Sequence, residues 1–331
     1  MGNLVNRWKA IWNPERYHGW GQKAYFEGWY FKIVDQAEDH AFAIIPGISI
    51  DEYGSGAAFI QLMDGKKLEA HYFDFTEEEF DPSSERFEVN VGANYFSASK
   101  VVLDLPNLKG TINISGKTGW PKSLGAPGIM GWYSFVPFMQ CYHGVVSLHH
   151  TLSGSLDYNG KTVDFENGIG YIEKDWGTSF PKCWIWMQSN HFEDLDRKVS
   201  LMASVAHIPW LGKYFIGFLV GFYLDDKLYK FATYTGAKRT TKINGDQVEL
   251  TFTQGKHKLE VIAHKAEGTD LISPISGEMR GKVNESLLAI LDVKLYEKEN
   301  LVYEGSGRNA GLELGGDVDI LLTTKSFKPS F

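Results

Sequence analysis

The chain has 331 residues, of which 43% are hydrophobic and 22% charged, a composition typical of a globular protein large enough for two domains. Its net charge of −8 argues against a nucleic-acid partner, and two cysteines, Cys141 and Cys183, are too few for a disulfide framework. The aromatic content of 14% is high. Rings in this number favour β-sheets and a binding site for an apolar ligand.

The chain begins with a short segment of helical pattern near Leu4–Trp12, which Pro14 ends. No apolar run of signal-peptide type is present there, so we expect a cytoplasmic protein with reduced cysteines.

Beyond the first residues, apolar and polar side chains alternate with period two and are interrupted by turn dipeptides. Asn159-Gly160 stands between two such runs and predicts a hairpin with a type I′ turn. Many short strands separated by turns of this kind predict an all-β fold of barrels or sandwiches.

The most apolar run covers residues 208–224 and predicts a buried strand. It contains Lys213 and is shorter than the roughly 20 residues that a membrane helix needs. Peripheral contact with a membrane remains open if the ligand is itself a lipid.

The two halves of the chain share a faint pattern, in which an aromatic strand is followed by a strand containing Ile-Pro. In the first half the pattern runs from Trp29 to Pro46, and in the second from Trp184 to Pro209. We therefore expect two β-barrels of similar plan, residues 1–160 and 161–331, that pack together.

Short catalytic motifs are of little use here. His143, His149 and His150 lack a standard ligand spacing, and adjacent histidines on a strand point to opposite faces. We expect no metal and no cofactor. A glycine pattern at Gly305 has no room for the βαβ unit of a dinucleotide site.

A stretch at residues 171–190 combines carboxyl groups with aromatic rings. Glu173 and Asp175 share a face if the segment is extended, while Lys174 points away. Burial and mutual repulsion would give one carboxyl the properties of an acid near neutral pH. An acid among aromatic rings suits the protonation of an alkene, because π faces stabilise the cation. Alternatively, these charges pair with lysines and the rings only pack a core.

Two long motifs resemble those of the tocopherol cyclase family: Phe26–Lys32, FEGWYFK, and Glu173–Trp184, EKDWGTSFPKCW. The likeness extends along most of the chain. It implies two lipocalin-like, calycin-type barrels and an activity that closes a prenylated hydroquinone to a chromanol without redox change or an organic cofactor. Plant members carry Asn at the position of Asp175, so Asp175 is not the universal acid of the family.

The leading hypothesis is a tocopherol cyclase-like enzyme that acts on a prenyl-quinol or related lipid. We expect catalytic roles for Asp175, Glu173 and Trp176. The residues expected to bind the substrate are Glu27, Trp29, Tyr30, Tyr171, Trp184, Trp186, Gln188, Asn190 and Arg308. The alternatives are a lipocalin-like protein that binds a lipid or pigment without catalysis, and a carotenoid hydratase-like enzyme that adds water to an alkene.

Overall fold

The computed structural model describes residues 2–194 and 197–322. The chain forms two compact units, each with its own apolar core. Unit 1 comprises the residues up to Phe180 together with Leu271–Lys282. Unit 2 comprises Pro181–Asp270 together with the residues from Val283 onward.

Unit 1 contains one α-helix, α1 (Gly2–Ile11), and a large antiparallel sheet. The strands of this sheet are β1 (Tyr25–Val34), β2 (Ala41–Ile50), β3 (Gly56–Asp64), β4 (Glu69–Thr76), β5 (Phe80–Pro82), β6 (Glu88–Val91), β7 (Asn94–Ser97), β8 (Lys100–Asp104), β9 (Leu108–Thr118), β10 (Cys141–Tyr158), β11 (Lys161–Asp164) and β12 (Ile169–Gly177).

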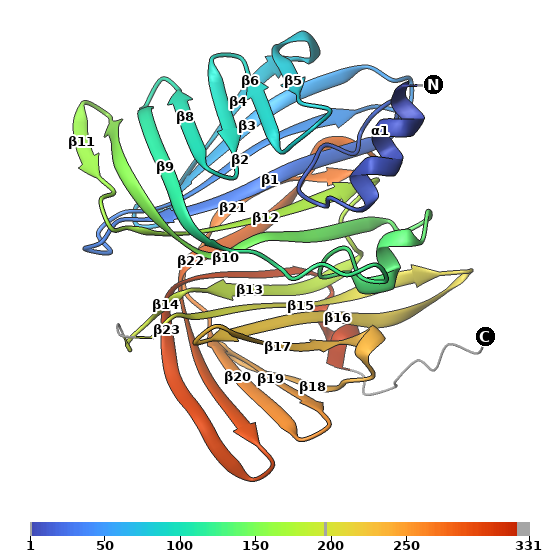
Figure 1. Ribbon diagram of the computed structural model, residues 1–331, viewed down its shortest axis with the longest axis vertical. Coiled ribbons are helices and arrows are strands. Elements are labelled where there is room, and N and C mark those ends of the chain that lie inside the picture. The colour runs from blue at the N-terminus through green and yellow to red at the C-terminus, as the bar shows by residue number, and fades with distance from the viewer. Residues whose placement is uncertain (1, 195–196, 323–331) are drawn as a thin grey trace. The chain divides into compact units, whose positions relative to one another are not determined.

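Neighbouring strands of unit 1 follow the order β4-β3-β2-β1-β12-β10-β9-β8-β7-β6-β5, and β11 pairs with β10 (Figure 1). The sheet is a series of consecutive antiparallel strands except where β12 is inserted between β1 and β10. Because of this insertion, β1 and β12, which are far apart in the sequence, are hydrogen-bonded neighbours. Glu173 and Asp175 lie on β12.

Unit 2 contains a second antiparallel sheet. Its strands are β13 (Cys183–Ser189), β14 (His191–Phe192), β15 (Val199–Trp210), β16 (Lys213–Leu224), β17 (Lys227–Ala232), β18 (Lys238–Asn244), β19 (Gln247–Gln254), β20 (His257–His264), β21 (Thr269–Ile275), β22 (Glu278–Glu297) and β23 (Asn300–Gly316). The main path is β17-β16-β15-β13-β23-β22-β20-β19-β18, with β14 against β23 and β21 against β22. The hairpin of β21 and β22 contains the segment that belongs to unit 1.

Short 3-10 helices lie between strands at Glu77–Glu79, Gly131–Phe135 and Thr233–Thr235, and a fourth, Val318–Leu322, follows β23. Among the described residues, no helix has both the length and the apolar character that a bilayer crossing requires.

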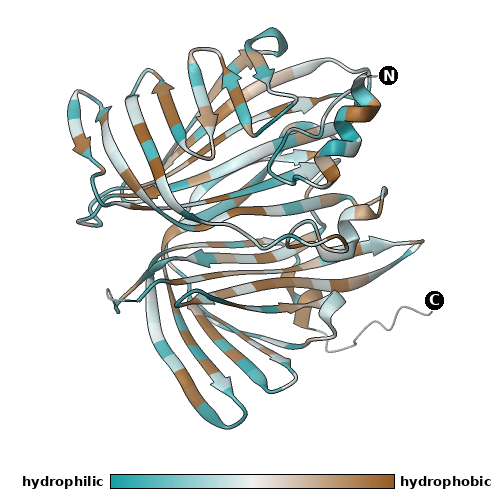
Figure 2. Cartoon of the chain, in the orientation of Figure 1, coloured by the Kyte–Doolittle hydropathy of each residue, from teal (hydrophilic) through white to brown (hydrophobic). Residues whose placement is uncertain are grey.

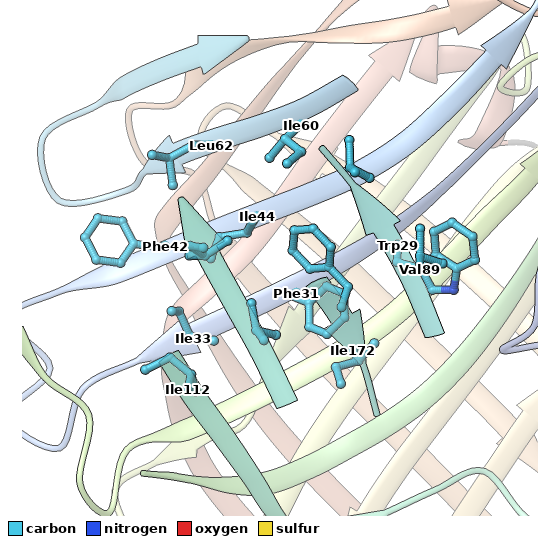
Figure 3. Packing of buried hydrophobic residues seen from close by; sticks show 14 of the residues in the cluster. Trp29, Phe31, Ile33, Phe42, Ile44, Ile60, Leu62, Val89, Ile112 and Ile172 are labelled. Carbon is cyan, nitrogen blue, oxygen red and sulfur yellow. The ribbon is translucent and has the colours of Figure 1, made fainter. Parts of the chain in front are cut away.

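Alternating side chains explain where each core lies. In β1 the residues Trp29, Phe31 and Ile33 point to one side, and Ile172 of β12 joins them from the neighbouring strand (Figure 3). The same alternation appears as bands of hydrophobic and hydrophilic residues along the strands (Figure 2). The prediction of an all-β protein with two lipocalin-like units is therefore confirmed.

Two local predictions are also confirmed. The helical pattern near the start of the chain forms α1, and Asn159-Gly160 joins β10 to β11 with positive φ at both residues, as a type I′ turn requires. Cys141 and Cys183 are free thiols.

The prediction of one buried strand over residues 208–224 is wrong. This run contains the end of β15, a turn at Leu211-Gly212 and the whole of β16. Both turn residues have positive φ, and the two strands pair with each other up to the turn. The turn could not be recognised from hydrophobicity, because one of its two residues is a leucine and most of the residues on both sides are also apolar.

The sequence placed the division between the two barrels after residue 160. In the structure, β12 lies beyond that point and is hydrogen-bonded to β1 and β10, and unit 1 continues to Phe180. The division depends on pairing between strands that are distant in the sequence. The alternation of residues within one segment does not show which distant strands pair, so it could not predict the division.

Candidate functional site

The residues of β12 divide between two faces of the unit 1 sheet. Ile172 and Trp176 belong to the apolar core, with Lys174 between them on the same face. Glu173 and Asp175 project from the opposite face. The structure therefore separates Trp176 from the two carboxyl groups with which the sequence analysis grouped it.

On the carboxyl face, His143 of β10 lies directly opposite Asp175. Its Nδ1 is 2.9 Å from Asp175 Oδ1, and its Nε2 is 3.4 Å from Glu173 Oε2. One imidazole thus stands between two carboxylates and faces each of them through a different ring nitrogen. A proton on each nitrogen would let the ring interact favourably with both carboxylates.

Tyr171 extends this group of side chains. Its hydroxyl donates a hydrogen bond to Glu173 Oε2 over 2.5 Å. Burial, with the nearby charge of Glu173, raises the pKa of Tyr171 well above its ordinary value, so the phenol stays protonated and acts as a donor. Tyr30 of β1 lies opposite Glu173 in the strand register and is also buried. We call Tyr171, Glu173, His143 and Asp175 the acid cluster.

Access to the acid cluster is unequal. The side chain of Glu173 is 5% exposed and that of His143 is 12% exposed, whereas that of Asp175 is 28% exposed. Cys141 contacts Asp175 through its thiol at 3.9 Å, and burial together with that carboxylate raises the pKa of the thiol. Asp175 is therefore the carboxyl that a ligand reaches most readily.

The three donors His143, Glu173 and Asp175 lie within 4.8 Å of one another and could hold a metal ion. The sequence analysis expected no metal. One ring nitrogen and one oxygen of each carboxylate are close enough to share an ion. The same side chains also contact one another directly, Nδ1 of His143 with Asp175 and Nε2 with Glu173.

The core face of the same strands holds a buried ion pair between Glu27 and Lys174, both fully buried. Glu27 also accepts hydrogen bonds from the Tyr25 hydroxyl at 2.6 Å and from the backbone N–H of His18 at 2.9 and 3.0 Å. Every oxygen of this carboxylate is engaged. The sequence analysis expected Glu27 to bind substrate, and the structure places it in this internal network.

Lys174 fastens the segment after α1 to the sheet. Its ammonium donates to the carbonyl oxygens of Pro14, at 3.1 Å, and of Arg16. It also lies 4.7 Å from the ring centroids of Trp29 and Trp176, a distance at which cation–π attraction contributes. Trp29 and Trp176 therefore surround a lysine inside unit 1.

The pKa values of the pair follow from burial and mutual attraction. Burial lowers the pKa of Lys174 to about 8, and the charge of Glu27 opposes part of this shift. Burial acts to raise the pKa of Glu27, but the charge of Lys174 and the hydrogen bond with His18 outweigh it, so the pKa lies below its ordinary value. At pH 7 both members are charged.

The other expected residues belong to unit 2. Trp184, Trp186 and Gln188 alternate along β13 and share the face opposite the unit 2 core. The indole N–H of Trp184 donates to Glu313 at 2.7 Å, and Trp186 and Gln188 are buried. The expected residues Asn190 and Arg308 lie near the end of this strand and near β14, respectively. Asn190 is buried and Arg308 is half-buried.

His143 was not predicted as a member of the site, because it was considered as a metal ligand or as a hydrogen-bonded or exposed histidine. No local signal joins His143 to Asp175, since the contact depends on the pairing of β10 with β12. The position of Trp176 was predictable, because the period that pairs Glu173 with Asp175 also sends their neighbour to the other face.

Comparison with known proteins adds a family. The model of a family described as tocopherol cyclase-like matches residues 107–316, which include the whole acid cluster. A probable tocopherol cyclase from Oryza sativa subsp. japonica and a tocopherol cyclase from Zea mays, both described as chloroplastic, are each 26% identical to this chain over 196 residues. The matches cover 56% of this chain and 42% and 41% of those proteins, so the chain spans about two fifths of their length.

Solved structures agree on the fold. A putative AttH from Nitrosomonas europaea aligns with a TM-score of 0.52 and 13% identity over 88% of this chain and 92% of its own. CghA with Sch210972 aligns with a TM-score of 0.53 and 13% identity over 88% of each chain. At this identity the likeness concerns architecture alone.

The buried ion pair makes a first prediction. Glu27→Gln leaves the Lys174 ammonium buried without its counter-charge and should lower the free energy of unfolding by roughly 3–5 kcal/mol in urea titrations. Adding Lys174→Met should recover most of that loss. The matched control is Lys109→Met, which breaks the exposed pair with Asp104 and should change the value by less than about 1 kcal/mol. A loss for Glu27→Gln no larger than that of the control would contradict the account.

The pH dependence of stability gives a second prediction. The pKa of Glu27 is about 4.3 in the unfolded chain and lower in the folded protein. Glu27 therefore contributes to the free energy of unfolding above about pH 4.3, and this contribution is lost as the pH falls through the folded pKa. Lys174→Met removes the lysine charge, so only the hydrogen bond and charge of His18 still oppose the effect of burial, and the folded pKa of Glu27 rises. The variant therefore loses more of the contribution of Glu27 at pH 7 than at pH 4. The destabilisation caused by Lys174→Met should therefore be smaller near pH 4 than near pH 7. Urea titrations at both values measure it, and an equal or larger difference near pH 4 would refute the prediction.

Proposed function

Since the chain belongs to the tocopherol cyclase-like family, we propose that it closes a prenylated hydroquinone to a chromanol by protonating an alkene and letting the phenol oxygen attack. The observation that carries the proposal is the acid cluster, in which His143 stands between Glu173 and Asp175. The family match and the two tocopherol cyclase relatives support a cyclase-type reaction, and the cluster offers an acid for it.

The reaction needs one proton delivered and one recovered. Asp175 is the most accessible carboxyl of the cluster and, when protonated, transfers its proton to the alkene carbon nearer the ring. The other alkene carbon becomes a tertiary cation, and the phenol oxygen forms a bond to it. The phenol proton then passes to the Asp175 carboxylate. The product is an isomer of the substrate, and no electron donor or acceptor is needed.

His143 and Glu173 control the proton that Asp175 uses. His143 Nδ1 is 2.9 Å from Asp175, a distance that allows direct proton transfer between the two groups. Glu173, which is held by the Tyr171 hydroxyl, fixes the other edge of the ring and stabilises its charge. The roles are thus a donor in Asp175, a reservoir in His143 and an orienting group in Glu173.

Glu173 and Tyr171 are buried, so they shield one side of the cation from solvent. The ring of Tyr30 is buried on the same face as Glu173, and its π system is suited to a nearby positive charge. Proximity of the phenol oxygen to the cation supplies much of the rate, because ring closure is intramolecular.

The test is turnover of a geranylated hydroquinone, followed by mass spectrometry. A chromanol of unchanged mass supports the proposal. A gain of 18 mass units indicates hydration instead, and tight binding without conversion indicates a binding protein. The same assay with a chelator should give the same rate, because His143 contacts both carboxylates directly. Loss of activity on chelation would assign the three donors to a metal.

The roles of the cluster give a third prediction. Asp175→Asn removes the donated proton and should lower kcat by at least about 100-fold. His143→Gln should also lower kcat and should shift the pH at which kcat is half-maximal, because the reservoir that recharges Asp175 is gone. Asp104→Asn, at an exposed carboxylate of β8, is the matched control and should leave kcat unchanged. Full activity of Asp175→Asn would contradict the assignment and leave Glu173 as the donor.

A further inference from the structure

Gln188 of β13 is fully buried in unit 2, and neither atom of its amide has a hydrogen-bond partner in the described structure. Burial of an amide in this state costs folding free energy, because the group gives up its hydrogen bonds to water.

Gln61 of β3 shows how this chain treats a buried glutamine of structural role. It is 4% exposed, and its amide bonds both backbone groups of Ile272, donating to the carbonyl at 3.0 Å and accepting from the N–H at 2.8 Å. Both glutamines are buried within their strands, yet only the amide of Gln61 is satisfied. Gln188 therefore needs a different explanation.

The neighbours of Gln188 explain why no protein group reaches it. Met202 of β15 and Gly311 of β23 stand directly opposite it in the two adjacent strands, and neither offers a polar side chain. The ring of Trp186 covers Gly311 so closely that a Cβ there would lie 2.5 Å from the indole. The residues opposite Gln188 are thus a methionine and a glycine covered by the Trp186 ring, with Glu285 Oε1 3.7 Å from the position of a Cβ at that glycine.

The same strand face continues with a second tryptophan. Trp184 lies over Gly315 in the same way, and its N–H is held by Glu313. Glu285 and Glu313 stand opposite each other on β22 and β23, on this same face, and would repel an anion. We call Trp184, Trp186, Gln188 and Met202 the Gln188 face.

We infer that the Gln188 face binds the neutral hydroxyl group of an apolar, ring-bearing ligand. A hydroxyl can form hydrogen bonds with both atoms of the amide, since its O–H donates to Gln188 Oε1 and its oxygen accepts from Nε2. The indole rings and Met202 then contact the apolar body. The ligand class, a hydroquinone with an aliphatic chain, is taken from the proposed function, and the site is a recognition site for its hydroxyl.

Binding can be tested without turnover. Decylhydroquinone has the ring and both hydroxyls but no alkene, so it cannot cyclise, and its dimethyl ether has no hydroxyl hydrogen. Affinities are measured by quenching of tryptophan fluorescence, under argon, with the full chain. The wild-type protein should bind decylhydroquinone about ten-fold more tightly than the ether. Gln188→Met should bind the two probes equally.

The second readout is the melting temperature without ligand. Gln188→Met replaces an unsatisfied amide by an apolar group of similar shape and should raise the melting temperature. Gln61→Met is the matched control and should lower it, because two backbone hydrogen bonds are lost. Opposite signs at these two positions would support a glutamine retained for binding.

Three results would overturn the inference. They are a lower melting temperature or failure to fold for Gln188→Met, retained preference for the hydroquinone in that variant, and absence of binding of either probe to the wild-type protein. These outcomes are separate from the proposed function, which fails if an alkene-bearing substrate yields no chromanol. A protein that binds decylhydroquinone through Gln188 but forms no chromanol would uphold this inference and refute the cyclase.

Discussion

The pairing of Glu27 with Lys174 is the interaction on which the organisation of unit 1 depends. It joins β1 to β12 on the core side, and through Lys174 it fixes the segment that follows α1. A buried ion pair is a costly way to hold two strands, because both charges lose their hydration. Here the ion pair fixes which side chains of β12 point to each face of the sheet. With Lys174 fixed on one side of β12, Glu173 and Asp175 must project from the other, where His143 meets them.

The two faces of β12 therefore use charge for different purposes. On the core face the charges are opposite, fully buried and saturated with hydrogen bonds, so they are poorly suited to exchange protons with a ligand. On the other face two carboxylates share one imidazole, and Asp175 retains access. Under the proposed mechanism, Asp175 uses this access to reach the alkene and its contact with His143 to recover a proton.

Period-two alternation was enough to predict the all-β class, the hairpin at Asn159-Gly160 and the common face of Glu173 and Asp175. Contacts that depend on pairing between distant strands could not be read in this way. The partnership of His143 with Asp175 is one example, and the inclusion of β12 in unit 1 is another. The alternative interpretation, that the charged residues of the two long motifs pair with lysines, is confirmed for Glu27, whose partner is Lys174. The prediction that Trp176 acts with the carboxylates was not consistent with alternation, because adjacent residues on a strand point to opposite faces.

Under the proposed function, the acid cluster gives one proton to the alkene carbon nearer the ring. Turnover of a geranylated hydroquinone in D2O, with the product examined by NMR, tests it most directly. We expect one deuterium at the chromanol carbon next to the new quaternary centre, in a single configuration, because a fixed carboxyl delivers it to one face of the alkene. A chromanol without deuterium at that carbon, or with deuterium equally in both configurations, would contradict the account.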